Sequence, residues 1–70
     1  MVVFVNTKNN TDALRAINIA KTTLKNDGYR NEKEKQYYLK QLGYYNSLIK
    51  KVMNAKSKGL QVKQVAFKFY

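Results

Sequence analysis

The sequence predicts an α+β fold with the element order β-α-α-β, in which an antiparallel helical hairpin packs on a small antiparallel sheet. Short β-branched and aromatic runs stand near the two ends of the chain, and two longer stretches with helical spacing of apolar residues lie between them. A helical hairpin returns the last strand antiparallel beside the first. Because two strands alone form a weak sheet, we expect a homodimer to complete it, using the first strand, the last strand or the second helix.

The first strand is the run VVFVN at residues 2–6, which carries apolar side chains on both faces and is therefore expected to be well covered. A loop rich in turn-forming residues, TKNN, follows it. Asn10 or Thr11 can cap the first helix, and Gly28 is a natural stop. The apolar stripe of this helix consists of Ala13, Ile17, Ala20 and Leu24.

The second helix begins at Asn31, which forms a capping-box pattern with Glu34, and we expect it to run to about Lys58 with Gly59 as its stop. Such a helix would span about 40 Å against about 24 Å for the first, so the shorter helix leaves part of it uncovered. Either Gly43 bends the second helix, or part of it docks on another subunit.

The last strand lies within residues 60–70, where apolar and polar residues alternate. Its core-facing residues are Val65, Phe67 and Phe69. Leu60 and Val62 fall out of phase with that face, which predicts a break in the strand near Lys63 and Gln64.

The charge of the chain is the strongest indication of function. Fourteen Lys and Arg against four Asp and Glu give a net charge of +10 on 70 residues, which form a single small basic domain. Such an excess attracts polyanions. The chain has no Cys and no His, so disulfides and zinc cannot stabilise it, and a partner subunit is the remaining device for so small a core.

The second helix carries two patterns that point to a binding surface. Tyr38 lies on the core stripe with Tyr45, whereas Tyr37 and Tyr44 lie one step round the helix. Next to that second pair runs a row of lysines within about 40° of one another. The row consists of Lys33, Lys40, Lys51 and Lys58. Lysines neutralise phosphates and aromatic rings stack on unpaired bases, but the same pattern also fits an ordinary solvated face beside tyrosines that complete the core.

The sequence contains no pattern for catalysis. Asp12, Glu32 and Glu34 stand where helix capping explains them, and Asp27 precedes a turn glycine, so no carboxylate pair is left for acid–base chemistry. The glycines are isolated and form no phosphate-binding loop. We therefore expect no enzyme activity, no catalytic residue, no metal site and no cofactor.

These observations favour a small nucleic-acid-binding accessory protein that contacts phosphates largely without sequence preference. Lysine outnumbers arginine twelve to two, which suits phosphate attraction better than base reading. The expected binding residues are Lys33, Lys40, Lys51, Lys58, Tyr37, Tyr44 and Arg30 in the turn between the helices. DNA and RNA, single and double strands, remain open as targets.

Two alternatives fit the same sequence. The chain can instead be a non-catalytic inhibitor or adaptor that binds an acidic protein, or an amphipathic protein at a membrane surface. The absence of a signal peptide and of any run of about 20 apolar residues predicts a cytoplasmic protein without a membrane span. The Lys-, Asn- and Tyr-rich composition is typical of phage or mobile-element proteins from AT-rich genomes.

Overall fold

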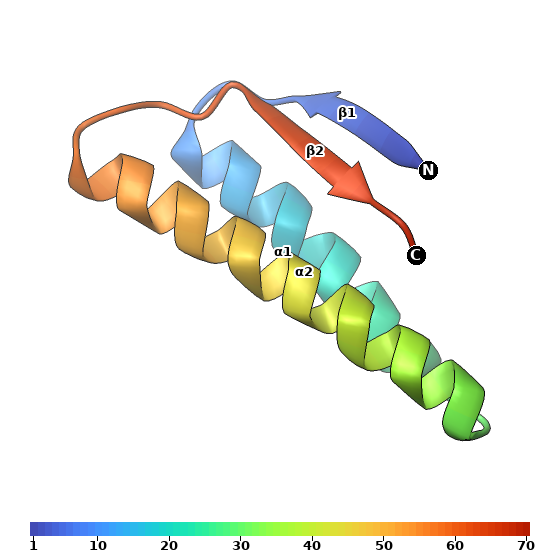
Figure 1. Cartoon of the computed structure of the whole chain (residues 1–70). Coiled ribbons are helices and arrows are strands. Elements are labelled where there is room, and N and C mark those ends of the chain that lie inside the picture. Colours follow the sequence, from blue (N-terminus) through green and yellow to red (C-terminus); the bar gives the residue numbers. More distant parts are fainter.

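The computed structural model describes all residues from 1 to 70 and confirms the predicted order β-α-α-β (Figure 1). Strand β1 covers Val2–Asn6, helix α1 covers Asn10–Asp27, helix α2 covers Glu32–Ser57 and strand β2 covers Gln64–Lys68. The two helices form an antiparallel hairpin with the longer α2, and the two strands pair antiparallel above it. The molecule is elongated, with principal extents of 42 × 20 × 18 Å.

The helix ends follow from local chemistry. Asn9, rather than the expected Asn10 or Thr11, caps α1, because its side chain accepts a 2.9 Å hydrogen bond from the backbone N–H of Asp12. At the start of α2, Asn31 accepts from the N–H of Glu34 at 2.8 Å, as the capping-box pattern predicts. These caps satisfy amide groups that have no partner within the helix.

Helix α2 ends in a Schellman motif. Gly59 has a φ of +75°, a conformation that only glycine adopts without strain. Its N–H donates to the carbonyl of Lys56 at 3.1 Å, and the N–H of Leu60 donates to the carbonyl of Ala55 at 2.9 Å. The helix continues without interruption through Gly43, so of the two alternatives for this long helix a break at the glycine is not seen, and docking on another subunit stays a prediction.

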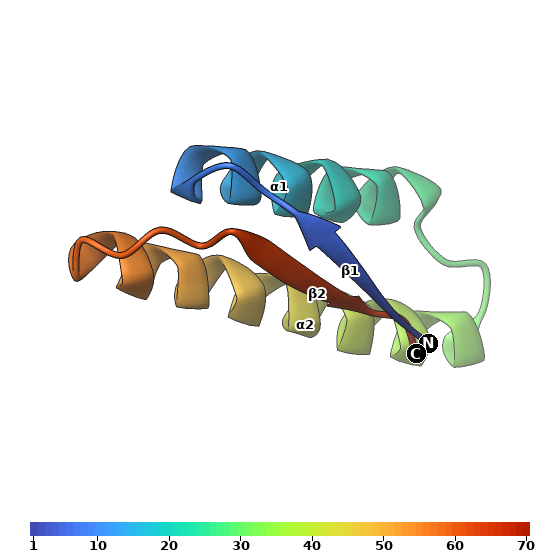
Figure 2. The same cartoon turned by 90° about the horizontal axis from the view of Figure 1, so that it is seen from above.

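The sheet pairs Phe4 with Ala66 at its centre, in an antiparallel register. Val65 and Phe67 of β2 are buried and Phe69 is half-buried, so the predicted core-facing side of this strand is confirmed. Strand β1 differs from the expectation of a covered strand: Val2, Val3, Phe4 and Asn6 are exposed, and only Val5 is half-buried. The reason is that the closest approach between the helices and the sheet is that of α2 to β2, and no helix lies as close to β1. In Figure 2, β2 runs over α2, while β1 crosses between β2 and α1.

The core is small and lies where the helices meet β2. Its buried apolar residues are Ala13, Ile17, Tyr45, Leu48, Val52, Val65 and Phe67. The small side chain of Ala13 allows α1 and α2 to approach closely, as its position in the apolar stripe predicts. Leu24, in the last turns of α1, is only partly buried against this cluster.

Helix α2 also covers the outer edge of β2. The hydroxyl of Tyr44 donates to the carbonyl of Ala66 at 2.6 Å, and the side-chain amide of Gln41 donates to the carbonyl of Lys68 at 2.8 Å. The oxygen of that amide accepts from the N–H of Tyr70 at 3.3 Å. Side chains of α2 thus take the place of a further strand along this edge.

A second polar anchor fixes the connection between α2 and β2. The amide of Asn10, at the first turn of α1, donates to the carbonyl of Leu60 at 2.6 Å and accepts from the N–H of Val62 at 2.8 Å. The hydroxyl of Thr7 donates to the carbonyl of Val62 at 2.8 Å. Both Thr7 and Asn10 are buried, and their bonds hold the segment before β2 against the start of α1. None of the helices has the length and apolar character that crossing a membrane requires.

Candidate nucleic-acid interface

The four lysines of the predicted row are all exposed: Lys33, Lys40 and Lys51 lie along one side of the uninterrupted α2 helix, and Lys58 follows directly after its last residue. The row (Lys33, Lys40, Lys51 and Lys58) covers 25 residue steps, which corresponds to about 37 Å of helix. One member of the row borders the sheet, because Lys51 lines a shallow groove together with Gln64 and Ala66 of β2. The charges are thus arranged linearly, next to the end of the sheet.

The two tyrosines beside this row have different environments. Tyr37 is 40% exposed, so one part of its ring is open to solvent. Tyr44 is half-buried, packs against the core and donates its hydroxyl to the edge of β2. Tyr44 therefore has a structural role at this edge, as the alternative interpretation of the pattern allowed, whereas Tyr37 keeps part of its side chain open to solvent.

Lys68 and Tyr70, which are not among the expected binding residues, add to this surface. Tyr70 is 52% exposed, and its ring packs edge-on against Tyr44 with 6.3 Å between the ring centroids. The ammonium group of Lys68 lies 5.1 Å from the centroid of the Tyr70 ring, within the range of a cation–π interaction. Alternation along the strand places Lys68 and Tyr70 on the same face. The hydrogen bonds between the Gln41 side chain and the backbone of these two residues hold this end of the strand beside α2.

Arg30, the remaining predicted binding residue, is exposed in the turn between the helices. At this end of the hairpin the ring of Tyr29 packs against Tyr38 with 5.3 Å between the centroids, and Lys35 lies 5.9 Å from the Tyr29 ring. Of the two tyrosines on the predicted core stripe, Tyr45 is buried in the core, whereas Tyr38 is half-buried at the hairpin tip and is not part of the core cluster. The hairpin tip thus extends the positive surface beyond the start of the lysine row.

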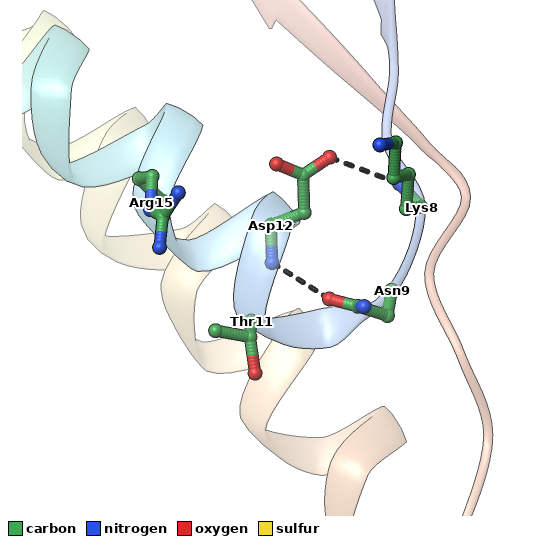
Figure 3. A pocket seen from close by; sticks show the side chains of 5 residues that line it. All are labelled: Lys8, Asn9, Thr11, Asp12 and Arg15. Carbon is green, nitrogen blue, oxygen red and sulfur yellow. Dashed lines mark hydrogen bonds between the residues drawn. The ribbon is translucent and has the colours of Figure 1, made fainter.

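A polar hollow of about 430 Å³ lies at the other end of the molecule, at the start of α1 (Figure 3). Its polar groups are largely used for capping: Asn9 accepts from the N–H of Asp12, and the Asp12 carboxylate accepts from the N–H of Lys8 at 2.9 Å. Lys8 and Arg15 add positive charge at its rim. The polar groups that line this hollow therefore belong to the turn that leads into α1 and to the cap of that helix.

The titratable groups of the chain show one clear perturbation. Burial raises the pKa of the Tyr45 hydroxyl above its ordinary value of 10.0, and the nearby Tyr37 raises it further, while Gln41 acts in the opposite direction. The burial behind this raised pKa is that of the core, where Tyr45 is only 3% exposed. No group of three or more His, Cys, Asp or Glu side chains is placed to hold a metal ion.

Comparison of the chain with protein-family models, curated proteins and solved structures gave no match. The functional assignment therefore depends on the surface of this chain alone. That surface combines the lysine row of α2 with the exposed rings of Tyr37 and Tyr70 and the ammonium group of Lys68.

Proposed function

We propose that this chain is a small nucleic-acid-binding protein, of the accessory type found in phages and mobile elements, and that it binds along the lysine row of α2. The observation that carries the proposal is the exposed lysine row on a helix that continues straight through Gly43. A bend at this glycine would divide the row into two short pairs, whereas a continuous helix keeps Lys33, Lys40 and Lys51 on one side, with Lys58 directly after the last residue of the helix. Such a row suits the regular spacing of phosphates better than it suits a compact ligand.

The contacts in this proposal are mainly to phosphates. Lysine is a flexible point charge without the bidentate geometry that reads base edges, so we expect weak sequence preference. The exposed rings of Tyr37 and Tyr70 add surfaces on which unpaired bases can stack, and stacking of this kind tolerates any base. Single-stranded nucleic acid would engage both features, while a duplex would engage the lysine row alone.

The test is a pair of substitutions in the middle of the row, Lys40→Gln with Lys51→Gln, which removes two positive charges. Both side chains are exposed, so the fold is expected to stay intact. Removing two of the phosphate contacts should reduce the slope of log K against log salt by about 1.4 for single strands or about 1.8 for a duplex. The matched control is Lys25→Gln with Lys50→Gln, which removes the same charge from exposed positions outside the row.

Equal effects of the two pairs on affinity and on salt slope would contradict the assignment to this face, because only the total charge would then matter. Tyr37→Ala separates the stacking contribution. It should weaken binding to a single strand by about 1 kcal/mol or more and leave binding to a duplex nearly unchanged.

A second candidate function is supported by one further observation on α2. Leu39 is 53% exposed and Met53 is 50% exposed, and helical spacing places them roughly 100° to 160° round the helix from the lysine row. An acidic amphipathic segment of another protein could use these apolar side chains together with the positive charge of the chain, as an inhibitor or adaptor would require. A partner that stays bound after nuclease treatment, and that Leu39→Glu releases, would favour this function over nucleic-acid binding.

A further inference from the structure

We infer that β1 is the dimer interface of this protein, and that a second copy of the chain pairs with its open edge to form a four-stranded antiparallel sheet. The inference is independent of nucleic-acid binding. It begins from the difference between the two edges of the sheet: side chains of α2 cover the outer edge of β2, whereas nothing in the chain covers the outer edge of β1.

The hydrogen bonds between the strands identify which backbone groups are free. The N–H of Thr7 donates to Lys63, and the N–H of Phe69 donates to the carbonyl of Met1. Since backbone groups alternate along a strand, the odd residues of β1 face β2 and the even ones face outward. The unpaired groups are therefore the N–H and C=O of Val2, Phe4 and Asn6.

These groups are self-complementary under two-fold symmetry. An antiparallel arrangement with Phe4 opposite Phe4 of the second copy pairs Val2 of each chain with Asn6 of the other, so every outward N–H and C=O of the strand finds a partner. Shifting the register by two residues leaves some of these groups unpaired. The favoured register also brings together the two Phe4 rings, each 63% exposed in the single chain.

An apolar groove of about 530 Å³ opens beside this edge, between the inner face of the sheet and α1. The residues that dominate it are Val3 and Val5 of β1, Ile19 and Ala20 of α1, and Phe67 and Phe69 of β2. Ile19 is 62% exposed at its border. A two-fold axis between the β1 strands puts the α1 helices of both copies on the same face of the enlarged sheet, where each closes the groove of the other.

The exposed area of the chain matches what such a dimer would bury. The chain exposes 5210 Å², whereas a compact monomer of its 8.2 kDa mass exposes about 4500 Å². The excess of about 700 Å² is close to the roughly 800 Å² that each partner buries in an interface of standard size. The excess exposed area is thus close to the area that one partner contributes to such an interface.

Charge favours a second copy over an acidic partner at this edge. Neither β1 nor the groove contains a charged side chain, although the chain carries a net charge of +10. An acidic protein would be attracted to the lysines on other parts of the surface. Two copies of the β1 edge, by contrast, can meet without bringing like charges into contact. The remaining long-range repulsion between the copies predicts that salt strengthens dimerisation, which is opposite to its effect on nucleic-acid binding.

The experiment measures the mass of the chain by sedimentation equilibrium, without nucleic acid, for the wild type and matched variants. We expect the wild type to approach twice the 8.2 kDa of the chain as concentration rises. Phe4→Pro removes an outward N–H and no bond to β2, so it should raise the dissociation constant of the dimer about thirtyfold or more, because two hydrogen bonds are lost per dimer. Phe4→Ala also removes the ring but keeps the N–H, and should weaken the dimer less.

If the Phe4→Pro variant fails to fold, Ile19→Glu still tests whether the groove is part of the dimer interface. It lowers the net charge and so reduces repulsion, yet it should weaken the dimer at least tenfold by placing a carboxylate in the apolar contact. Leu39→Glu makes the same charge change at an exposed residue on α2 and should leave the dimer intact.

Disulfide formation tests the register, because the chain has no natural cysteine. Phe4→Cys should cross-link the dimer, since directly opposed Cα atoms lie about 5.5 Å apart, within disulfide range. Asn6→Cys should not cross-link, because the two Asn6 positions are offset by about 14 Å along the strands. A wild type that stays monomeric at high concentration, a dimer unaffected by both Phe4→Pro and Ile19→Glu, or cross-linking through Asn6 but not Phe4 would overturn the inference.

Discussion

Replacing Gln41 with Met should destabilise the fold by about 2 kcal/mol, although Met matches the length of Gln and has a similar helix propensity. Gln41 is only 1% exposed, and its amide bonds both the carbonyl of Lys68 and the N–H of Tyr70. Each lost hydrogen bond costs about 1 kcal/mol net, and more where the freed backbone group stays out of reach of water. A domain of 70 residues has a total stability of about 3.5 to 10 kcal/mol, so this single change removes a large share of it.

The assay is urea unfolding followed by circular dichroism, with Gln36→Met as the matched control. Gln36 lies on the same helix and is exposed, so its replacement should change the free energy of unfolding by less than about 0.5 kcal/mol. Equal stability of the two variants would refute the account of how α2 covers the edge of β2. The Gln41 variant should also bind single strands less tightly, because it releases the strand end that holds Lys68 and Tyr70.

Two further changes test other parts of the structure. Gly43→Ala should stabilise the protein by about 1 kcal/mol and raise its melting temperature by about 4–8 °C in a thermal scan, since a Cβ at this exposed helical position meets nothing within 4 Å. A loss of stability would mean that another backbone approaches this position. Tyr45→Phe should reduce the loss of stability at high pH. The pKa of Tyr45 is raised in the folded state, so this hydroxyl stabilises the fold below pH 10.0 and loses that effect as the pH rises above it. The urea midpoints at about pH 8 and about pH 11 should therefore differ less in the variant than in the wild type, and equal differences would contradict a buried Tyr45.

The elements were predictable because their signals are local. The capping pair at Asn31 and Glu34, the stop at Gly59 and the alternation of Val65 and Phe67 each depend on neighbours a few residues away, and the structure has all of them as expected. The lysine row followed from helical geometry in the same manner, because positions on one helix are fixed by their spacing.

The buried polar groups were not predictable in this manner. Gln41 and Asn10 bond to backbone groups that lie 27 and 50 positions away in the chain, and no sequence pattern marks such a contact. The exposure of β1 was not predicted from the sequence for a related reason. An apolar run is expected to be covered, but whether this chain or a second copy covers it depends on how the helices share the sheet.

The central claim is that α2 neutralises phosphates, and the most direct measurement is the affinity of the wild-type chain for labelled single- and double-stranded DNA and RNA across a salt series, by fluorescence anisotropy. The account predicts binding whose log K falls linearly with log salt, with a slope of about −3 to −4 for the four lysines of the row. No binding to any of the four nucleic acids at low salt, or an affinity that does not change with salt, would contradict it.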